Sequence, residues 1–98
     1  MDGDLKNIII KLKNLKKPIL EKYKAEIIAL FGSYVRGDQA PGSDLDIIAR
    51  FGEGTTLIDV AGLNDYLREQ LDISVDIVSE RAVREELKEK IFGEAVLL

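Results

Sequence analysis

Apolar residues near the start of the chain recur at intervals of three and four positions, which is the spacing of one helical face. They are Leu5, Ile8, Ile9, Leu12 and Leu15. Lysines occupy several of the positions between them, so the pattern predicts an amphipathic helix over residues 4–16. Pro18 fits the first turn of a helix, where its missing N–H has no intrahelical partner, and it predicts a second short helical segment over residues 19–24.

Three later stretches have strand-like patterns. Residues 25–31 (AEIIALF) are almost continuously aliphatic and end at Gly32, as in a strand that is buried on both faces. Residues 45–51 predict a second strand, and residues 74–78 (SVDIV) alternate polar and apolar positions as a third strand does. Between the first two strands, residues 38–43 (DQAPGS) concentrate turn-forming residues and predict a loop.

A longer helix is predicted after the glycine-containing turn at residues 52–54. Thr56 can cap this helix because Asp59 follows at the capping-box position, and the apolar spacing continues to about Leu71. The stripe that we expect to be buried consists of Leu57, Val60, Ala61, Leu63, Leu67 and Leu71.

The last predicted helix begins at Ser79 or Glu80 and continues to Ile91, and the apolar tail at residues 94–98 (EAVLL) has no assigned structure. The alternation of helices and strands predicts an α/β or α+β fold, a small mixed β-sheet with helices packed on it. A chain of 98 residues has the length of one domain, so we expect a single domain over residues 1–98. Small domains bury a modest share of their surface, which is compatible with a homo- or hetero-oligomer.

The composition restricts the available chemistry. The sequence contains no cysteine and no histidine, which excludes disulfides, thiolate metal sites, cysteine nucleophiles and imidazole bases. Any catalysis must therefore use carboxylates, hydroxyls, amines and metal ions. The apolar run at residues 8–10 is too short for a signal-peptide core or a membrane span, so we expect a cytoplasmic protein without a membrane partner.

Charge is unevenly distributed along the chain. The net charge of −4 argues against dedicated duplex binding, so nucleic acid is not an expected partner. The first 24 residues nevertheless carry an excess of lysine over acidic residues. This basic stripe is open to two interpretations, a surface that meets phosphates or an acidic partner, and the solvated face of an amphipathic helix.

The first candidate for chemistry is the segment at residues 31–37 (FGSYVRG), where a predicted strand breaks at a glycine and enters a helical turn. Such a turn directs free backbone N–H groups outward, and these groups attract phosphate. Gly32 leaves room for a phosphate, Ser33 can donate its hydroxyl at or near the cap, and Arg36 adds a positive charge. The same residues also fit a purely structural turn, since short glycine motifs occur often by chance.

The second candidate is a set of aspartates on the predicted strands. Asp44 and Asp46 are two positions apart, so they project from the same face, while Leu45 and Ile47 point into the core. Two carboxylates on one face repel each other unless a cation lies between them, and oxygen ligands suit Mg²⁺ or Mn²⁺. Asp76 lies in the third strand and would complete a cluster able to hold two divalent ions if the two strands are neighbours. Each aspartate could also be an ordinary polar position on an exposed strand.

The combination of these features resembles a known family. The stretch GSYVRGDQAPGSDLDI is similar to the signature G-S-x-A-R-G…S-D-x-D-[IL] of the minimal nucleotidyltransferases, small relatives of DNA polymerase beta. Val35 stands where alanine is usual, and this difference removes no reacting group. The resemblance covers nearly the whole chain and implies the polymerase beta-like nucleotidyltransferase fold, as one minimal nucleotidyltransferase domain.

The resemblance also implies roles for individual residues. The nucleotide would bind at Gly32, Ser33 and Arg36. Asp44 and Asp46 would ligate Mg²⁺ or Mn²⁺, with two ions expected, and Asp76 would be the third catalytic carboxylate and metal ligand, which positions or deprotonates the attacking hydroxyl. The reaction would be nucleotidyl transfer, in which an acceptor oxygen attacks the α-phosphorus of an NTP and pyrophosphate leaves.

Similar members of the family are often encoded beside a small helical HEPN protein and act as the antitoxin of a toxin–antitoxin pair. Some of them transfer AMP to a tyrosine of the toxin. The resemblance therefore implies ATP or another NTP as donor and a HEPN-type toxin as partner. Two alternatives stay open: a binding module that neutralises its partner by contact alone, and an enzyme that nucleotidylates a small molecule.

Overall fold

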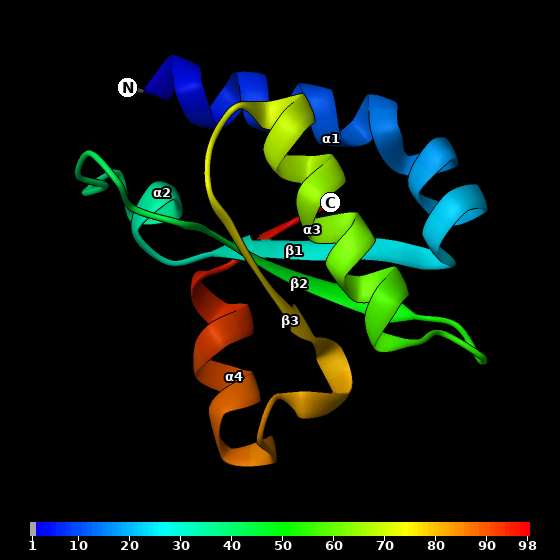
Figure 1. The fold of residues 1–98 in the computed structure, drawn as a ribbon. Coiled ribbons are helices and arrows are strands. Elements are labelled where there is room, and N and C mark those ends of the chain that lie inside the picture. The colour runs from blue at the N-terminus through cyan, green and yellow to red at the C-terminus, as the bar shows by residue number, and fades with distance from the viewer. Residues whose placement is uncertain (1) are drawn as a thin grey trace.

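The computed structural model describes residues 2–98 and, from Leu5 onward, their side chains. Figure 1 shows the elements along the chain. They are α1 (Asp2–Tyr23), β1 (Ala25–Phe31), α2 (Ser33–Arg36), β2 (Leu45–Phe51), α3 (Leu57–Leu71), β3 (Val75–Ser79), the 3₁₀ helix η1 (Glu80–Ala82), α4 (Glu85–Glu94) and β4 (Val96–Leu97). No helix in this part of the chain is long and apolar enough to cross a membrane.

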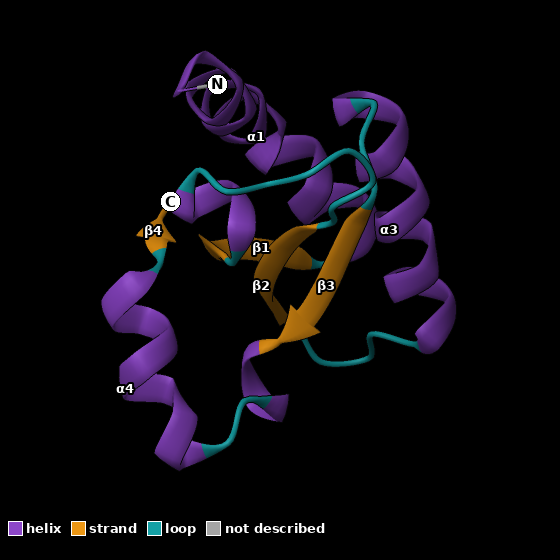
Figure 2. Ribbon diagram, turned by 90° about the vertical axis from the view of Figure 1, so that its left-hand side faces the viewer, coloured by secondary structure: helices purple, strands orange, loops and turns teal. Residues whose placement is uncertain are grey.

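Within the described residues the strands form one mixed sheet in the order β3-β2-β1-β4. β1 runs antiparallel to both of its neighbours, and β2 and β3 run parallel to each other. α1 and α3 pack together on one face of this sheet, and α4 lies on the other side (Figure 2). The fold is therefore the mixed α/β arrangement that the alternation of elements predicts.

The core fills the space between the sheet and the α1–α3 pair. Its buried side chains come from β1, β2 and β3 and from α1 and α3. The largest fully buried members are Leu12, Ile19, Ile27, Leu30, Leu45, Ile47, Leu63 and Leu67. We call this side of the sheet the core face, and the opposite side the carboxylate face, because Asp46 and Asp76 project from it.

A β-bulge in β1 decides which residues reach each face. Ile27 pairs with Ala49 and Ala29 pairs with Ile48, so Ile28 is the extra residue. The bulge puts both Ile27 and Leu30 on the core face although three positions separate them. β1 is thus not uniformly buried on both faces as predicted, because Glu26 is exposed.

The two helical segments predicted on either side of Pro18 are a single helix, so that prediction was wrong. α1 continues through Pro18, which lies inside it. Leu12 and Ile19 are fully buried and seven positions apart, which places them on one helical face. Burying each such side chain contributes about 1.5–3 kcal/mol, enough to offset the roughly 3 kcal/mol that an interior proline costs a helix.

The chain after β3 also differs from the prediction of one continuous helix from Ser79 or Glu80 to Ile91. Val83 and Arg84 are extended, which separates η1 from α4. The Glu80 carboxylate accepts a hydrogen bond of 2.9 Å from Arg50 of β2, and this contact holds η1 against the sheet. The unassigned tail forms β4, where Val96 pairs with Leu30.

Only the second half of the apolar stripe predicted for α3 is buried. Leu63, Leu67 and Leu71 are buried. Leu57 is 87% exposed instead, because the first turn of the helix lies over an unfilled hollow rather than over the core. Thr56 and Asp59 form the predicted capping box.

Candidate active site

The parallel pairing of β2 and β3 brings two of the predicted aspartates side by side. Asp46 and Asp76 are direct partners in the register, so their side chains emerge on the same face of neighbouring strands. Such strands are about 4.8 Å apart. Their neighbours Leu45 and Ile47 are fully buried on the core face, which prevents a shift of the register by one residue.

Asp44 lies one residue before β2 and is exposed, as is Asp76, whereas Asp46 is half-buried. Burial raises the pKa of Asp46, and the nearby negative charges of Asp76 and Asp44 raise that pKa further. Asp44 and Asp76 are therefore each close enough to Asp46 to interact with it electrostatically. None of the three takes part in a salt bridge with another of the described residues.

This donor set fits a divalent cation, although its side chains are not yet arranged around one point. Among residues with described side chains, no group of three acidic residues is positioned to hold a metal ion. A cation would draw the carboxylates of Asp44, Asp46 and Asp76 together and relieve the repulsion that, after burial, contributes to the raised pKa of Asp46.

The glycine of the turn lies directly against Asp46. Gly32 has a φ of +85°, and a Cβ atom at this position would overlap the Asp46 carboxylate. Gly32 also serves as the N-cap of α2, so Ser33 is the first residue of the helix rather than its cap. The pairing of Phe31 with Asp46 puts the end of β1 beside the carboxylates. The turn and the aspartates thus form one continuous site.

Two polar groups of the turn can interact with an anion. The first N–H groups of α2 have no intrahelical acceptor, because the bonds of this short helix begin with Val35 and Arg36 donating to the Gly32 carbonyl. Arg36 lies 3.3 Å from Asp38 and is near enough to Asp46 to lower its pKa. The site therefore places positive charge and free donors beside the carboxylates.

Sequence reasoning assigned no structural role to two residues that shape this site. Ser43 accepts a 2.9 Å hydrogen bond from the Ala40 N–H and donates its own N–H to the Ala40 carbonyl, which fixes the loop just before Asp44. Arg50 projects from the carboxylate face and pairs with Glu80 and Glu26. The two-residue period of β2, continued past Asp46, could have indicated this position of Arg50.

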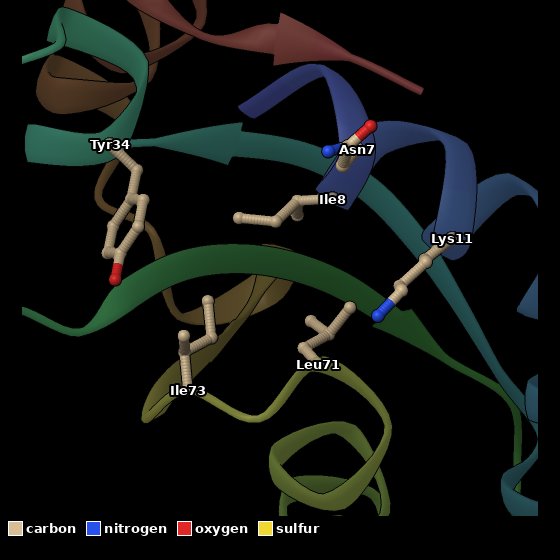
Figure 3. A pocket seen from close by; sticks show the side chains of 6 residues that line it. All are labelled: Asn7, Ile8, Lys11, Tyr34, Leu71 and Ile73. Carbon is tan, nitrogen blue, oxygen red and sulfur yellow. The ribbon is translucent and has the colours of Figure 1, made fainter. Parts of the chain in front are cut away.

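A separate hollow of about 340 Å³ lies on the α1 side of the turn (Figure 3). Tyr34 of α2 lines it together with residues of α1, the last residue of α3 and one residue of the segment that leads from α3 to β3. These residues are Asn7, Ile8, Lys11, Leu71 and Ile73. None of the predicted site residues is among them, so this hollow is distinct from the carboxylate site.

Residues 12–98 match the sequence family described as nucleotidyltransferase domain. A Methanocaldococcus jannaschii protein assigned as a protein adenylyltransferase is 40% identical over 79 residues, which cover 81% of this chain and 85% of that protein. The protein adenylyltransferase MntA of Thermococcus cleftensis is 33% identical over 83% of this chain and 82% of its own length.

Solved structures share the fold. One described as a minimal nucleotidyltransferase has a TM-score of 0.68 and 38% identity, and the alignment covers 89% of this chain and 95% of that one. A chain of a toxin–antitoxin crystal structure with AMP-PNP has a TM-score of 0.65 and 31% identity, with coverage of 93% of this chain and 69% of that one.

Proposed function

Since the chain belongs to the nucleotidyltransferase domain family and is a nucleotidyltransferase, we propose that it transfers AMP from ATP to a hydroxyl group of a partner protein. The observation that carries the proposal is the pairing of Asp46 with Asp76 against Gly32. That arrangement supports metal binding by the carboxylates and triphosphate binding at the turn beside them. Relatives assigned as protein adenylyltransferases support a protein as the acceptor.

The nucleotide binds at the turn in this proposal. Gly32 has no side chain, so the Asp46 carboxylate can lie directly against the backbone of the turn that would bind the triphosphate. Ser33 donates its hydroxyl and Arg36 supplies a positive charge to the triphosphate. The exposed position of Arg36 lets it leave Asp38 for a phosphate oxygen, because exposed ion pairs contribute only about 0–1 kcal/mol.

Asp44, Asp46 and Asp76 would hold the divalent ions, Mg²⁺ or Mn²⁺, with two ions as the proposed number. When bound, such ions neutralise charge on the phosphates and on the attacking and leaving oxygens. The carboxylates supply the negative charge that keeps the ions in place.

In the transfer step, the acceptor hydroxyl oxygen forms a bond to the α-phosphorus of ATP. The bond from that phosphorus to the oxygen leading to the β-phosphate breaks, and pyrophosphate leaves. The hydroxyl proton passes to the carboxylate of Asp76, which is exposed on an edge strand and can be reached by an acceptor from outside. AMP is then joined to the partner through a phosphodiester bond.

We further propose that the partner is a HEPN-type toxin, that the chain acts as its antitoxin, and that the reaction takes place in the cytoplasm. A structural relative at 31% identity belongs to a toxin–antitoxin structure with AMP-PNP, which supports both an antitoxin role and a nucleotide donor. Neutralisation by contact alone is the second candidate. It is favoured by Leu57 and Ile58, which are 87% and 82% exposed and form an apolar surface suited to a partner.

The test is label transfer from α-labelled ATP, with Mg²⁺ or Mn²⁺, to the proposed HEPN-type toxin partner. Asp44→Asn and Asp46→Asn should each abolish transfer, while Asp65→Asn, an exposed aspartate of α3, should not. Transfer that survives in both site variants would remove the carboxylates from the mechanism. Tight binding of the toxin by the wild type without any transfer would establish neutralisation by contact.

A further inference from the structure

We propose that the acceptor segment of the partner protein binds as an extended strand along the open edge of β3, with its hydroxyl residue opposite Asp76 and an adjacent apolar residue in the hollow beneath Leu57. This inference rests on the proposed function, because it states how the acceptor reaches the same site. β3 is the last strand of the sheet, so one of its edges has no neighbouring strand among the described residues.

The hydrogen bonds of β3 identify the backbone groups on that edge. The Leu45 N–H donates to the Ser74 carbonyl at 2.9 Å, so Ser74 and every second residue after it turn their backbone groups toward β2. Val75, Ile77 and Ser79 therefore direct theirs outward. The Val75 carbonyl agrees with this assignment, since it accepts a hydrogen bond of 3.4 Å from Asn64 of α3.

Asn64 covers only the beginning of the edge. The backbone groups of Ile77 and the N–H of Ser79 have no partner strand in the described part of the chain. In Figure 1, β3 crosses in front of β2 and no other described segment lies in front of it. An open edge of this kind is a template for an added strand.

Side-chain alternation then assigns positions on the incoming strand. Asp76 projects from the carboxylate face, and Ile77 projects from the core face. A residue opposite Asp76 would extend its side chain onto the carboxylate face, with its Cβ about 4.5–5.5 Å from that of Asp76. The next residue toward the end of β3 would extend onto the core face, beside Ile77.

The core face at that point is hollow rather than filled. A hollow of about 460 Å³ lies between the end of β3 and the first turn of α3. Its apolar lining comes from Phe51, Leu57, Val60 and Ile77. Arg81 is the one charged residue among the described residues that line it. The hollow suits an apolar side chain, with an acidic residue further along to meet Arg81.

Three properties of one segment thus select the same occupant. The unpaired backbone groups of β3 can bind an extended chain, and the hollow can hold an apolar side chain. Asp76 can accept the proton of a hydroxyl group that lies next to that side chain. A serine, threonine or tyrosine directly adjacent to an apolar residue meets these needs, whereas a helical segment offers no backbone groups to the edge.

The experiment uses Ser79→Pro, which removes one outward N–H and no bond to β2. Ser79 has a φ of −68°, which a proline adopts without strain, and proline is tolerated on edge strands for this reason. Ser79→Ala is the matched control because it keeps the N–H and removes only the hydroxyl. Leu57→Asn tests the hollow, with Leu20→Asn as control on α1, where Leu20 is 58% exposed.

With α-labelled ATP and the HEPN-type toxin as probe, Ser79→Pro and Leu57→Asn should each lower kcat/KM for the toxin by about tenfold, the loss expected for one hydrogen bond or one buried leucine. The KM for ATP and the kcat/KM of Leu20→Asn should stay within about twofold of wild type, and Ser79→Ala should lose clearly less activity than Ser79→Pro because it keeps the N–H. Mass spectrometry of the labelled toxin should place AMP on a hydroxyl residue next to an apolar residue.

The outcomes separate this inference from the proposed function. Wild-type transfer together with unchanged kcat/KM in both variants would overturn the edge as the acceptor site, and so would a modified residue without an apolar neighbour. No transfer by the wild type would overturn the proposed function itself. If circular dichroism shows that Ser79→Pro does not fold, Leu57→Asn and the mapped residue decide the question.

Discussion

β2 carries two groups of charges on one face of the sheet, and the groups are arranged in opposite ways. At its beginning, Asp46 lies opposite Asp76 without a salt bridge among the described residues, and its pKa is raised by burial and then by the two neighbouring aspartates. Near its end, Arg50 lies between Glu26 and Glu80, and its hydrogen bond to Glu80 lowers the pKa of that carboxyl.

The difference shows where this small domain keeps unfavourable interactions. The Arg50 group is satisfied within the fold and joins β1, β2 and η1. The aspartate group is unsatisfied within the fold, which leaves its charge available to bind cations from solution. A chain folded for stability alone would have no reason to place like charges in register, so the contrast favours a functional role for the aspartates.

Gly32→Ala is expected to have the largest effect on label transfer, and it tests whether the aspartate group has a functional role. The added Cβ would overlap the Asp46 carboxylate and would also strain a backbone with a φ of +85°. We expect label transfer to fall at least about 100-fold, because misplacing a group by about 1 Å costs that much in rate. Thermal unfolding and label transfer measure the two consequences.

Gly37→Ala is the matched control for that variant. Gly37 has a φ of +81°, but no atom lies within 4 Å of an added Cβ. It should therefore share the backbone strain of about 1 kcal/mol and keep most of the transfer activity. Equal losses of activity in the two variants would show that the contact between Gly32 and Asp46 has no special role.

Asp46→Asn is expected to stabilise the fold, whereas Gly32→Ala should destabilise it. The change should be smaller than the effect of Gly32→Ala. The folded state holds the Asp46 proton more tightly than the unfolded state, so the charged carboxylate destabilises the fold at neutral pH. The amide removes that penalty, and the variant should unfold at a higher temperature than wild type at pH 7 in the absence of metal. The gain should shrink as the pH falls through the raised pKa toward the ordinary value of 3.8.

Added Mg²⁺ sharpens this prediction. A bound cation would stabilise the wild type, since ligand binding to the folded state raises stability. Mg²⁺ should therefore reduce or reverse the difference in unfolding temperature between Asp46→Asn and the wild type. Thermal unfolding at several pH values with and without Mg²⁺ measures both effects. A variant less stable than wild type at pH 7 without metal would mean that Asp46 is a structural residue.

Glu80→Gln is expected to have the smallest effect on stability. Glu80 lies in η1 and pairs with Arg50 near the end of β2. The pKa of Glu80 is lowered by Arg50, so its charge stabilises the fold above its ordinary pKa of 4.5, and this contribution is lost as the pH falls below that value. The variant should be slightly less stable at pH 7 and equal to wild type under acid conditions. Salt should reduce the difference in stability between the variant and the wild type, because the Arg50–Glu80 pair is exposed. Higher stability at pH 7 would contradict the contrast between the two charge groups.

Local features of the sequence predicted most elements because their causes are local. The capping pair Thr56 and Asp59, the alternation in residues 74–78 and the glycine after β1 act within a few positions of each other. The errors arose where distant residues decide the outcome. Pro18 stays helical because Leu12 and Ile19 pack on a sheet formed later in the chain, and η1 stops short because Glu80 meets Arg50.

In the candidate site, too, some features could be predicted from local sequence and others depend on distant residues. The motif residues could be named from the sequence, and the strand periodicity placed Asp44 and Asp46 on one face, but their neighbours along the sheet could not be derived from spacing. Their roles as nucleotide and metal ligands stay predictions until the variants above are measured. The bulge at Ile28, the partners of Arg50 and the open edge of β3 depend on contacts between distant segments, so the sequence carries no local signal for them.

The sequence by itself determined the kind of chemistry, since it offers carboxylates, a glycine–serine turn and an arginine but neither cysteine nor histidine. In β2 and β3 the sequence also determined which side of the strand is apolar. Only the tertiary structure decided that β2 and β3 are parallel neighbours in the register that sets Asp46 against Asp76. Strand order depends on how the helices pack on the sheet, and that packing is a property of contacts between residues far apart in the chain.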